Sequence, residues 1–160
     1  MKNLGIDIGT SSVKLVIMDN DRIVFKWYKR HHGRLTEALY EGLKASDEEL
    51  KAPVALMVTG TNAKIITSRL VRADVLGEIP AIAAGIRHEA PGALSCMDIG
   101  GQGARFITGL DLGAPEFSAN EHCAGGTGSF FEDQMSRLDM RIEDYSEVLK
   151  EARSIPRLSG

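Results

Sequence analysis

The chain has 160 residues, of which 43% are hydrophobic and 26% are charged, and its formal net charge is −3. This composition is typical of a folded protein with an ordinary core, and its slight acidity argues against a nucleic-acid-binding protein. No apolar run is long enough to cross a membrane, and the N-terminus enters a strand without a signal peptide, so we expect a cytoplasmic protein. Two cysteines in that compartment favour thiols or metal ligands over a disulfide.

The first half of the chain predicts strands and helices in alternation. Apolar and β-branched residues fill three runs separated by turn-forming residues, at 4–8, 13–18 and 23–27. This close spacing predicts a three-stranded antiparallel meander. A helix should follow, because leucines recur at the spacing of one helix face, with Thr36 as its N-cap. A strand is expected at 54–58, before the polar loop of residues 59–62, and a helix at 77–87 has Pro80 in its first turn.

The strand–turn–strand pattern restarts just beyond Pro91 and Gly92, which predicts two lobes, residues 1–92 and 93–160. The second lobe should contain three strands, at 94–99, 104–108 and 116–119. An amphipathic helix should follow from 130 onward, and a shorter helix at 143–152. We expect this second lobe to be incomplete.

A motif repeats between the lobes. Residues 5–10 and residues 96–101 each form an apolar β-type run that ends in an aspartate and is followed by glycine. Repetition of this kind indicates two similar halves that face a shared cleft, each presenting a carboxylate and a bare backbone turn. Such an arrangement suits the phosphates of a nucleotide and their metal ion.

The first of these turns offers several groups to an anion. Backbone amides and hydroxyls suited to phosphate oxygens come from Gly9, Thr10, Ser11 and Ser12. Lys14 adds a positive charge if strand alternation points it toward the cleft, and Asp7 is placed to hold Mg²⁺ through water. The competing interpretation is a plain β-hairpin that needs a glycine and solubilising hydroxyls.

The second turn carries a second carboxylate. Asp98 could bind the metal through water or orient an attacking water molecule, and Gln102 could position that water by hydrogen bonding. The amides of Gly100 and Gly101 can approach an anion closely. Neither turn has the spacing of a P-loop or of G-x-G-x-x-G, so the pair indicates a different phosphate-binding architecture.

The two turns resemble the phosphate 1 and phosphate 2 motifs of the acetate and sugar kinase, Hsp70 and actin superfamily. Residues 120–132, in which Cys123 precedes Ala-Gly-Gly-Thr-Gly and an aromatic helix start, are similar to a segment of the BadF/BadG/BcrA/BcrD ATPase family. That family includes activators of 2-hydroxyacyl-CoA dehydratases and subunits of benzoyl-CoA reductase. The resemblance implies an α/β fold of ribonuclease H-like, actin/Hsp70-type ATPase lobes, with ATP bound between them.

The resemblance also implies that Cys123 is a ligand of a [4Fe-4S] cluster that bridges a homodimer, with a second cysteine expected beyond residue 160. A thiolate at a helix N-terminus is stabilised by unpaired amides, and glycines at 125 and 126 let amides approach the sulfurs. His122 is an alternative ligand, although a solvent-facing neighbour fits it better. Cys96 lies in an apolar strand and is expected to be a core thiol.

By this resemblance the whole protein binds ATP or ADP with Mg²⁺, hydrolyses ATP and drives a low-potential electron into a 2-hydroxyacyl-CoA dehydratase or a benzoyl-CoA reductase-like partner. Two other functions remain open, a small-molecule kinase with Asp98 as the base and a non-catalytic nucleotide-binding or dimerisation module. For these 160 residues alone we expect no ATPase activity. The chain differs from the family at Gly103-Ala104-Arg105, where an aspartate, a small residue and a lysine are common. It also differs at residues 59–64, where the family commonly has T-G-Y-G-R.

Overall fold

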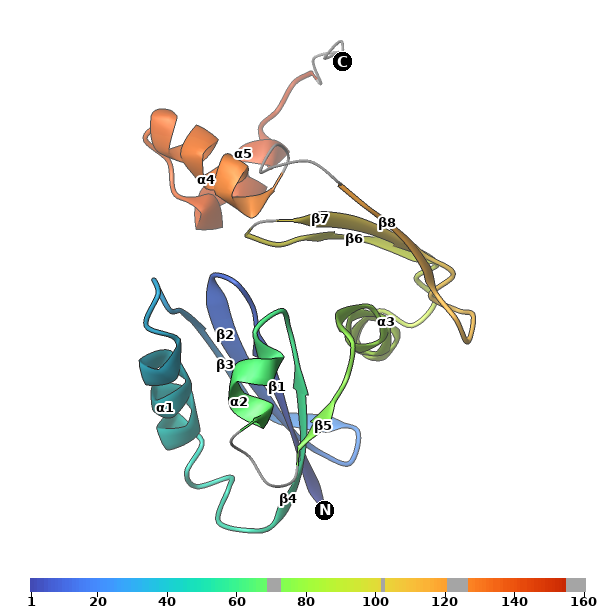
Figure 1. Ribbon diagram of the computed structural model, residues 1–160. Helices are drawn as coiled ribbons and strands as arrows, with labels where there is room; N and C mark the ends of the chain where they lie inside the picture. The colour runs from blue at the N-terminus through green and yellow to red at the C-terminus, as the bar shows by residue number, and fades with distance from the viewer. Residues whose placement is uncertain (69–72, 102, 121–126, 155–160) are drawn as a thin grey trace. The chain divides into compact units, whose positions relative to one another are not determined.

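The computed structural model describes residues 1–68, 73–101, 103–120 and 127–154 (Figure 1). The chain divides into two compact units, one formed by Met1–Cys96 with Ile107–Phe117 and the other by Met97–Phe106 with Ser118–Gly160. The predicted lobe boundary after Gly92 stays a prediction. Within the described ranges, no helix combines the length and apolar character that a membrane span needs.

The first unit is built on a five-stranded sheet with the order β3-β2-β1-β4-β5. Its strands are β1 (Lys2–Ile8), β2 (Ser12–Asp19), β3 (Arg22–Arg30), β4 (Val54–Thr59) and β5 (Asp74–Val75). The first three pair antiparallel, which confirms the predicted meander, whereas β4 pairs parallel to β1 and β5 pairs parallel to β4. The parallel pairing brings the carboxyl ends of β1 and β4 to the same edge.

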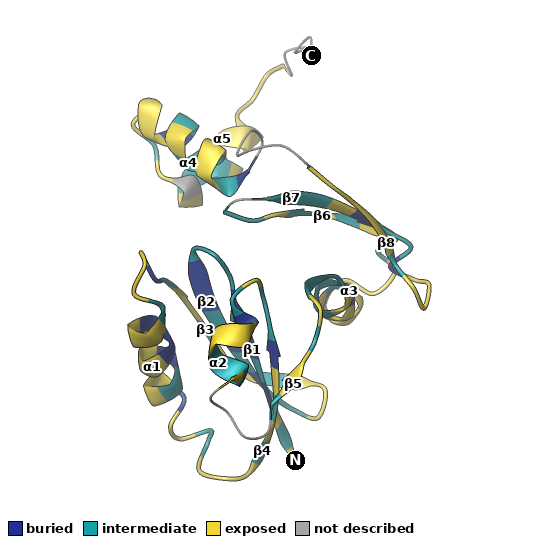
Figure 2. Cartoon of the chain, in the orientation of Figure 1, coloured by how far each residue is buried: buried dark blue, intermediate teal, exposed yellow. Residues whose placement is uncertain are grey.

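One face of this sheet is covered by the helices α1 (Leu35–Ala45) and α2 (Ala63–Thr67) (Figure 1). Alternate positions of β1 and β2 point into the core beneath them, and Figure 2 shows these strand positions as buried. Helix α1 begins at Leu35 with Arg34 at the N-cap position and no side-chain cap bond. The prediction of Thr36 as N-cap was therefore wrong, because Thr36 already lies inside the first turn.

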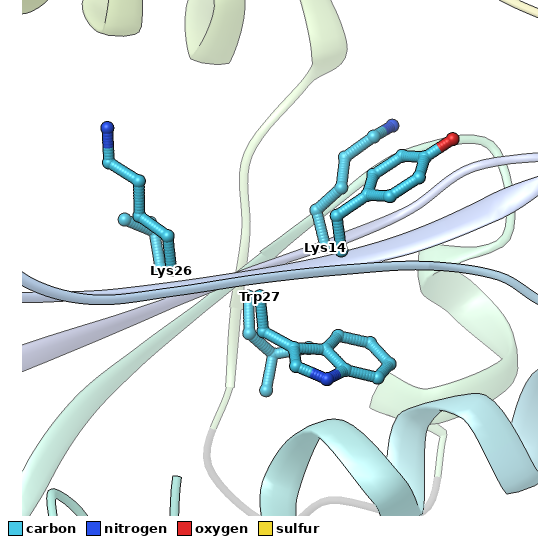
Figure 3. A pocket seen from close by; sticks show the side chains of 6 residues that line it. Lys14, Lys26 and Trp27 are labelled. Carbon is cyan, nitrogen blue, oxygen red and sulfur yellow. The ribbon is translucent and has the colours of Figure 1, made fainter. Parts of the chain in front are cut away.

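The opposite face of the sheet carries charged side chains near β2 and β3. Figure 3 shows the side chains of Lys14 and Lys26 on this face, while Trp27 points to the other side, toward the helices. Strand alternation produces this division, because neighbouring residues of a strand point to opposite faces. Neighbouring residues of β2 and β3, from both faces of the sheet, line a shallow hollow, namely Lys14, Leu15, Val16, Lys26, Trp27 and Tyr28.

A second, smaller core lies under helix α3 (Glu78–Glu89), which has Pro80 in its first turn as predicted. Ala83 of this helix packs with Ile107 and Leu110, and the partly buried Cys96 contacts the same cluster, which fits the expected core thiol. The cluster draws on a three-stranded sheet of order β6-β7-β8. Its strands are β6 (Ser95–Ile99), β7 (Ala104–Thr108) and β8 (Glu116–Ala119), each close to its predicted range.

The described C-terminal part of the second unit is helical. It contains α4 (Gly128–Arg137), a 3₁₀ turn η1 (Ile142–Asp144) and α5 (Tyr145–Lys150). Phe131 of α4 packs edge-to-face against Tyr145, with the ring centres 5.6 Å apart, so an aromatic contact joins the two helices. The predicted helix over 143–152 is thus present, but it is shorter and begins with a 3₁₀ turn.

Candidate phosphate-binding site

Asp7 lies near the end of β1 and is paired in register with Lys14 of β2. The Lys14 Nζ atom donates to Asp7 Oδ2 at 2.8 Å, and both side chains are partly exposed. A Cβ placed on Gly9 would lie 3.8 Å from Lys14 Nζ, so the ammonium group is beside the turn. The Lys14 side chain therefore lies beside the turn, and its orientation toward the predicted cleft stays a prediction. Because the ion pair is partly solvated, its main effect is on orientation rather than stability.

The end of β4 lies directly against the Asp7 carboxylate. Thr59 is the register partner of Asp7, and Gly60 follows it with a φ of +97°. A Cβ on Gly60 would lie 2.5 Å from Asp7 Oδ1 and 2.5 Å from the Ile8 carbonyl oxygen. Only glycine fits this position, because any side chain would collide with both groups and would also strain the left-handed backbone.

In the turn between β1 and β2, the carbonyls of Gly9 and Ser11 have hydrogen-bond partners, whereas two amides have none in the described part of the chain. The Gly9 carbonyl accepts a hydrogen bond from the Asn62 side chain at 3.0 Å, and the Ser11 carbonyl accepts one from the backbone N–H of His31 at 3.0 Å. The N–H groups of Thr10 and Ser11 donate to no acceptor in the described part of the chain. Successive unbonded amides at a tight turn form an anion-binding concavity.

Ser12 is buried, and its carbonyl accepts the Gly9 N–H at 3.0 Å, which closes the turn. Thr10 and Ser11, in contrast, are only partly buried. The structure thus brings together the six residues predicted for the first turn, namely Asp7, Gly9, Thr10, Ser11, Ser12 and Lys14. Their roles in binding stay predictions.

Two residues beside this turn were not predicted as site residues. Asn62 follows β4, and His31 follows β3, so both reach the turn through strand pairing rather than through local sequence. The sequence indicated a polar loop at 59–62. Its position beside the turn depends on the parallel pairing of β4 with β1, which was not predicted. The sequence around His31 contains no motif that indicates its position beside the turn.

The oxygen atoms around Asp7 suit a magnesium ion. Mg²⁺ prefers oxygen ligands and keeps much of its hydration shell, so a carboxylate that holds it through water is a fitting partner. The hydroxyl oxygen of Thr59 is buried and has no hydrogen-bond partner within the described residues. An unsatisfied oxygen of this kind is the sort of group that an ordered water completes. The donor set at Asp7 therefore fits Mg²⁺ bound through water.

The second turn connects β6 to β7. Asp98 of β6 accepts a hydrogen bond from Arg105 of β7 at 3.3 Å, and both side chains are about one-third exposed, at 32% and 28% respectively. The Gly100 N–H donates to the Gly103 carbonyl at 2.8 Å and closes the turn. Arg105 thus supplies a positive charge to the carboxylate that was predicted to serve the metal or the attacking water.

The turn at Gly100 and Gly101 is bonded to the start of helix α4. The N–H of Gly128 donates to the Gly100 carbonyl at 2.7 Å, and the N–H of Ser129 donates to the Gly101 carbonyl at 3.3 Å. The Ser129 hydroxyl also donates to the Gly101 carbonyl. A Cβ on Gly128 would lie 3.0 Å from the Gly100 carbonyl oxygen, so a larger residue there would have to push the turn slightly away. Two of the helix's first amides are therefore already bonded.

Several predicted residues lie outside the described part of the chain, namely Gln102, His122, Cys123, Gly125 and Gly126. Within the described part, no group of three or more histidine, cysteine, aspartate or glutamate side chains is arranged to hold a metal ion. Asp7 and Asp98 belong to different units, so the shared cleft between the two turns stays a prediction.

The chain is similar to known proteins over its whole length. An activator of lactoyl-CoA dehydratase from Anaerotignum propionicum is 28% identical over 171 residues, which cover 100% of this chain and 62% of the activator. The crystal structure of component A of the Acidaminococcus fermentans (R)-2-hydroxyglutaryl-CoA dehydratase aligns with a TM-score of 0.79 and 23% identity. The alignment covers 100% of this chain and 62% of component A. This chain thus spans less than two-thirds of the length of these relatives.

A second solved structure, the Clostridium difficile activator of 2-hydroxyisocaproyl-CoA dehydratase with bound ADPNP, aligns with a TM-score of 0.75 and 22% identity. This chain covers 60% of that protein, with 100% of its own residues aligned. These likenesses confirm the predicted α/β fold. The family model for the BadF/BadG/BcrA/BcrD ATPase family matches residues 4–158. The chain therefore belongs to the BadF/BadG/BcrA/BcrD ATPase family.

Proposed function

We propose that this chain is the nucleotide-binding part of an ATP-dependent activator of a 2-hydroxyacyl-CoA dehydratase or a benzoyl-CoA reductase-like partner. The whole protein hydrolyses ATP with water to ADP and phosphate, and the hydrolysis drives the transfer of one low-potential electron to that partner. Support comes from the family match and from relatives whose names describe activators of such dehydratases.

The observation that carries the ATP-binding part is the turn between β1 and β2. The amides of Thr10 and Ser11 have no acceptor in the described residues, and the Lys14 ammonium lies beside Gly9. Amide and ammonium donors are the groups that bind phosphate oxygens, and charge-assisted bonds of this type are the strong ones. We therefore assign the turn to the phosphates of ATP or ADP.

We assign the two carboxylates to the metal ion and to the attacking water. Asp7, which is in register with Thr59 at the end of β4, would hold the hydration shell of Mg²⁺ through its carboxylate. Mg²⁺, when bound, neutralises phosphate charge. Asp98 and Gln102 orient the attacking water, and Arg105 keeps the Asp98 carboxylate in place. The Gly101 amide offers the second phosphate contact, because the Gly100 N–H is already bonded to the Gly103 carbonyl.

The electron-transfer part rests on Cys123 and its sequence neighbours. When bound, a [4Fe-4S] cluster stores and releases one electron at low potential. In the proposed homodimer each subunit supplies two cysteine thiolates, and Cys123 is one of them. Gly125 and Gly126 let backbone amides approach the thiolate sulfurs, where hydrogen bonds tune the reduction potential.

Anaerobic purification of the full-length protein tests the electron-transfer part. We expect about four irons per dimer by metal analysis and a paramagnetic signal of the reduced cluster by electron paramagnetic resonance. Cys123→Ser should abolish this signal and leave nucleotide binding intact. Cys96→Ser is the matched control, because Cys96 packs against the Ala83 cluster and should not affect iron content. A cluster-free dimer that still hydrolyses ATP would remove the electron-transfer role.

The ATPase part has a separate test. In the full-length protein, Asp7→Asn should lower Mg²⁺-dependent ATP turnover by about 100-fold, because a neutral amide binds the waters of the ion more weakly than a carboxylate does. Asp19→Asn, at the other end of β2, should leave turnover unchanged. If Asp7→Asn retains full turnover, the first turn does not serve the metal. Phosphoryl transfer to a small hydroxyl substrate that survives Cys123→Ser would favour a kinase instead.

A further inference from the structure

We propose that Asn62 and His31 are positioning residues that orient the Gly9–Thr10 peptide so that the Thr10 N–H faces the phosphate of a bound nucleoside triphosphate. This inference rests on the proposed function of the turn. Neither residue belongs to the glycine-hydroxyl motif itself, and they lie 53 and 22 residues from Gly9 along the chain. Strand pairing brings both of them to the same carbonyl oxygen.

Asn62 is fixed to the turn at two consecutive carbonyls. Its backbone N–H donates to the Ile8 carbonyl at 2.9 Å, and its side-chain amide donates to the Gly9 carbonyl at 3.0 Å. Only the nitrogen of that amide can donate to a carbonyl, so the direction of the side chain is determined. The next residue, Ala63, is buried and begins helix α2. The amide is therefore held from behind by packed structure.

His31 is the second donor to the Gly9 carbonyl. Its ring is almost fully buried, and its Nδ1 atom accepts the backbone N–H of Gly33 at 3.1 Å. A nitrogen that accepts carries no hydrogen in the neutral ring, so the hydrogen is on Nε2. The Nε2 atom lies 3.4 Å from the Gly9 carbonyl oxygen and can donate to it. The backbone N–H of His31 also holds Ser11, as described above.

The planarity of the peptide group turns these contacts into a direction for the next amide. The Gly9 carbonyl and the Thr10 N–H belong to one trans peptide, so they point in opposite directions. Two donors that hold the carbonyl toward Asn62 and His31 therefore turn the Thr10 N–H away from them, on the side where it has no acceptor in the described residues. Without these donors the peptide could rotate and present a carbonyl, which repels phosphate.

The test compares Asn62→Ala, His31→Ala and the double variant in the full-length protein, with Asn3→Ala as the matched control on an exposed part of β1. Affinity for the Mg²⁺ complex of a non-hydrolysable ATP analogue is measured by calorimetry. We expect Asn62→Ala to weaken binding about tenfold, as the loss of one well-placed hydrogen bond does. His31→Ala should weaken it by about threefold because its contact is longer. The double variant should lose more than the product of the two, since each donor compensates for the other.

A spectroscopic measurement separates this inference from the proposed function. The ¹H–¹⁵N resonance of Thr10 in the nucleotide-free protein should shift in both single variants and most in the double one, while resonances in α1 stay in place. Asn62→Asp, which keeps the shape but lacks the donor, should give the same shift if the alanine variant folds poorly. A protein that binds no nucleotide yet shows these shifts refutes the proposed function alone. A Thr10 resonance and an affinity that match Asn3→Ala overturn the roles of Asn62 and His31.

Discussion

At the scale of single residues, Gly60 shows how closely the backbone is packed against the candidate site. Two separate penalties apply to a side chain there, a φ of +97° and a collision with Asp7 and Ile8. Gly92 has nearly the same φ, +98°, but a Cβ there meets nothing within 4 Å. The two glycines therefore distinguish the conformational penalty from the collision.

We expect Gly92→Ala to lower the free energy of unfolding by about 1 kcal/mol, because an L-residue is strained at positive φ. Gly60→Ala should lower it by about 3 kcal/mol or more and should also displace the Asp7 carboxylate. Urea denaturation of both variants measures the difference. Equal losses in the two variants would mean that the β4 end relaxes without disturbing Asp7.

His88 shows a different residue-scale effect, which depends on pH. Its Nε2 atom is 3.0 Å from the Asp21 carbonyl, and Nδ1 is 3.4 Å from Glu89. The bond to the Asp21 carbonyl, assisted by Glu89, raises the pKa of His88 above its ordinary value of 6.5. Because the folded protein favours the protonated ring, the stabilisation is complete below the ordinary pKa and is lost as pH rises through the folded-state pKa.

We therefore expect His88→Gln to reduce the urea midpoint more at about pH 5.5 than at about pH 8.5. The effect should be small, since the ring is at the surface and solvent screens it. Denaturation curves of wild type and variant at the two pH values provide the check. A difference that grows toward alkaline pH would contradict the assigned direction.

At the scale of elements, helix α1 approaches the sheet through a glycine. A Cβ on Gly42 would lie 2.8 Å from the Trp27 ring and 3.0 Å from Leu15. Glycine within a helix is ordinarily unfavourable by about 1 kcal/mol relative to alanine. Its presence here is explained by the close contact between α1 and the indole, which an added methyl group would force apart.

Gly42→Ala should therefore lower the melting temperature despite the higher helix propensity of alanine, because the collision with the partly buried Trp27 ring outweighs about 1 kcal/mol of propensity. Gly85→Ala in α3 is the control, since a Cβ there has open space, and it should raise the melting temperature. Thermal unfolding followed by circular dichroism measures both. Stabilisation by both variants would show that α1 can shift away from the sheet at little cost.

The elements that could be predicted from the sequence are those with a clear period. The β1–β3 meander and the helices α1 and α3 follow from alternation and from apolar residues on one face. Helix α2 has five residues and β5 has two, too short for either period to appear, and both were missed. The parallel pairing of β4 with β1 is a long-range contact, so the placement of Asn62 beside Gly9 could not be predicted from local pattern.

At the scale of the whole molecule, the two units differ in how much they bury. The first unit has a continuous core over β1, β2, β4 and two helices. In the described part of the second unit, only Thr127 and Met135 are buried. Since apolar burial is the main stabilising term in folding, the units should open with different free energies.

Native-state hydrogen exchange of this 160-residue chain should therefore give two classes of amide. The slowest amides should lie in β1 and β2, around Ile8, Val13 and Ile17, whose side chains are fully buried. Amides of α4 and α5 should exchange faster by at least about tenfold, because their local opening exposes little apolar surface. Nuclear magnetic resonance of exchange in D₂O measures this, and uniform protection would mean that the two units unfold as one.

The bonds between the Gly100–Gly101 turn and the first amides of α4 have a mechanical consequence. A helix transmits displacement along its axis because each turn is bonded to the next. The backbone N–H groups of Gly128 and Ser129 donate to the carbonyls of Gly100 and Gly101. Because Gly128 has no side chain, the start of α4 lies in direct contact with the turn. A rotation of the peptides at 100 and 101 would then either break these bonds or move the first turn of α4 with them.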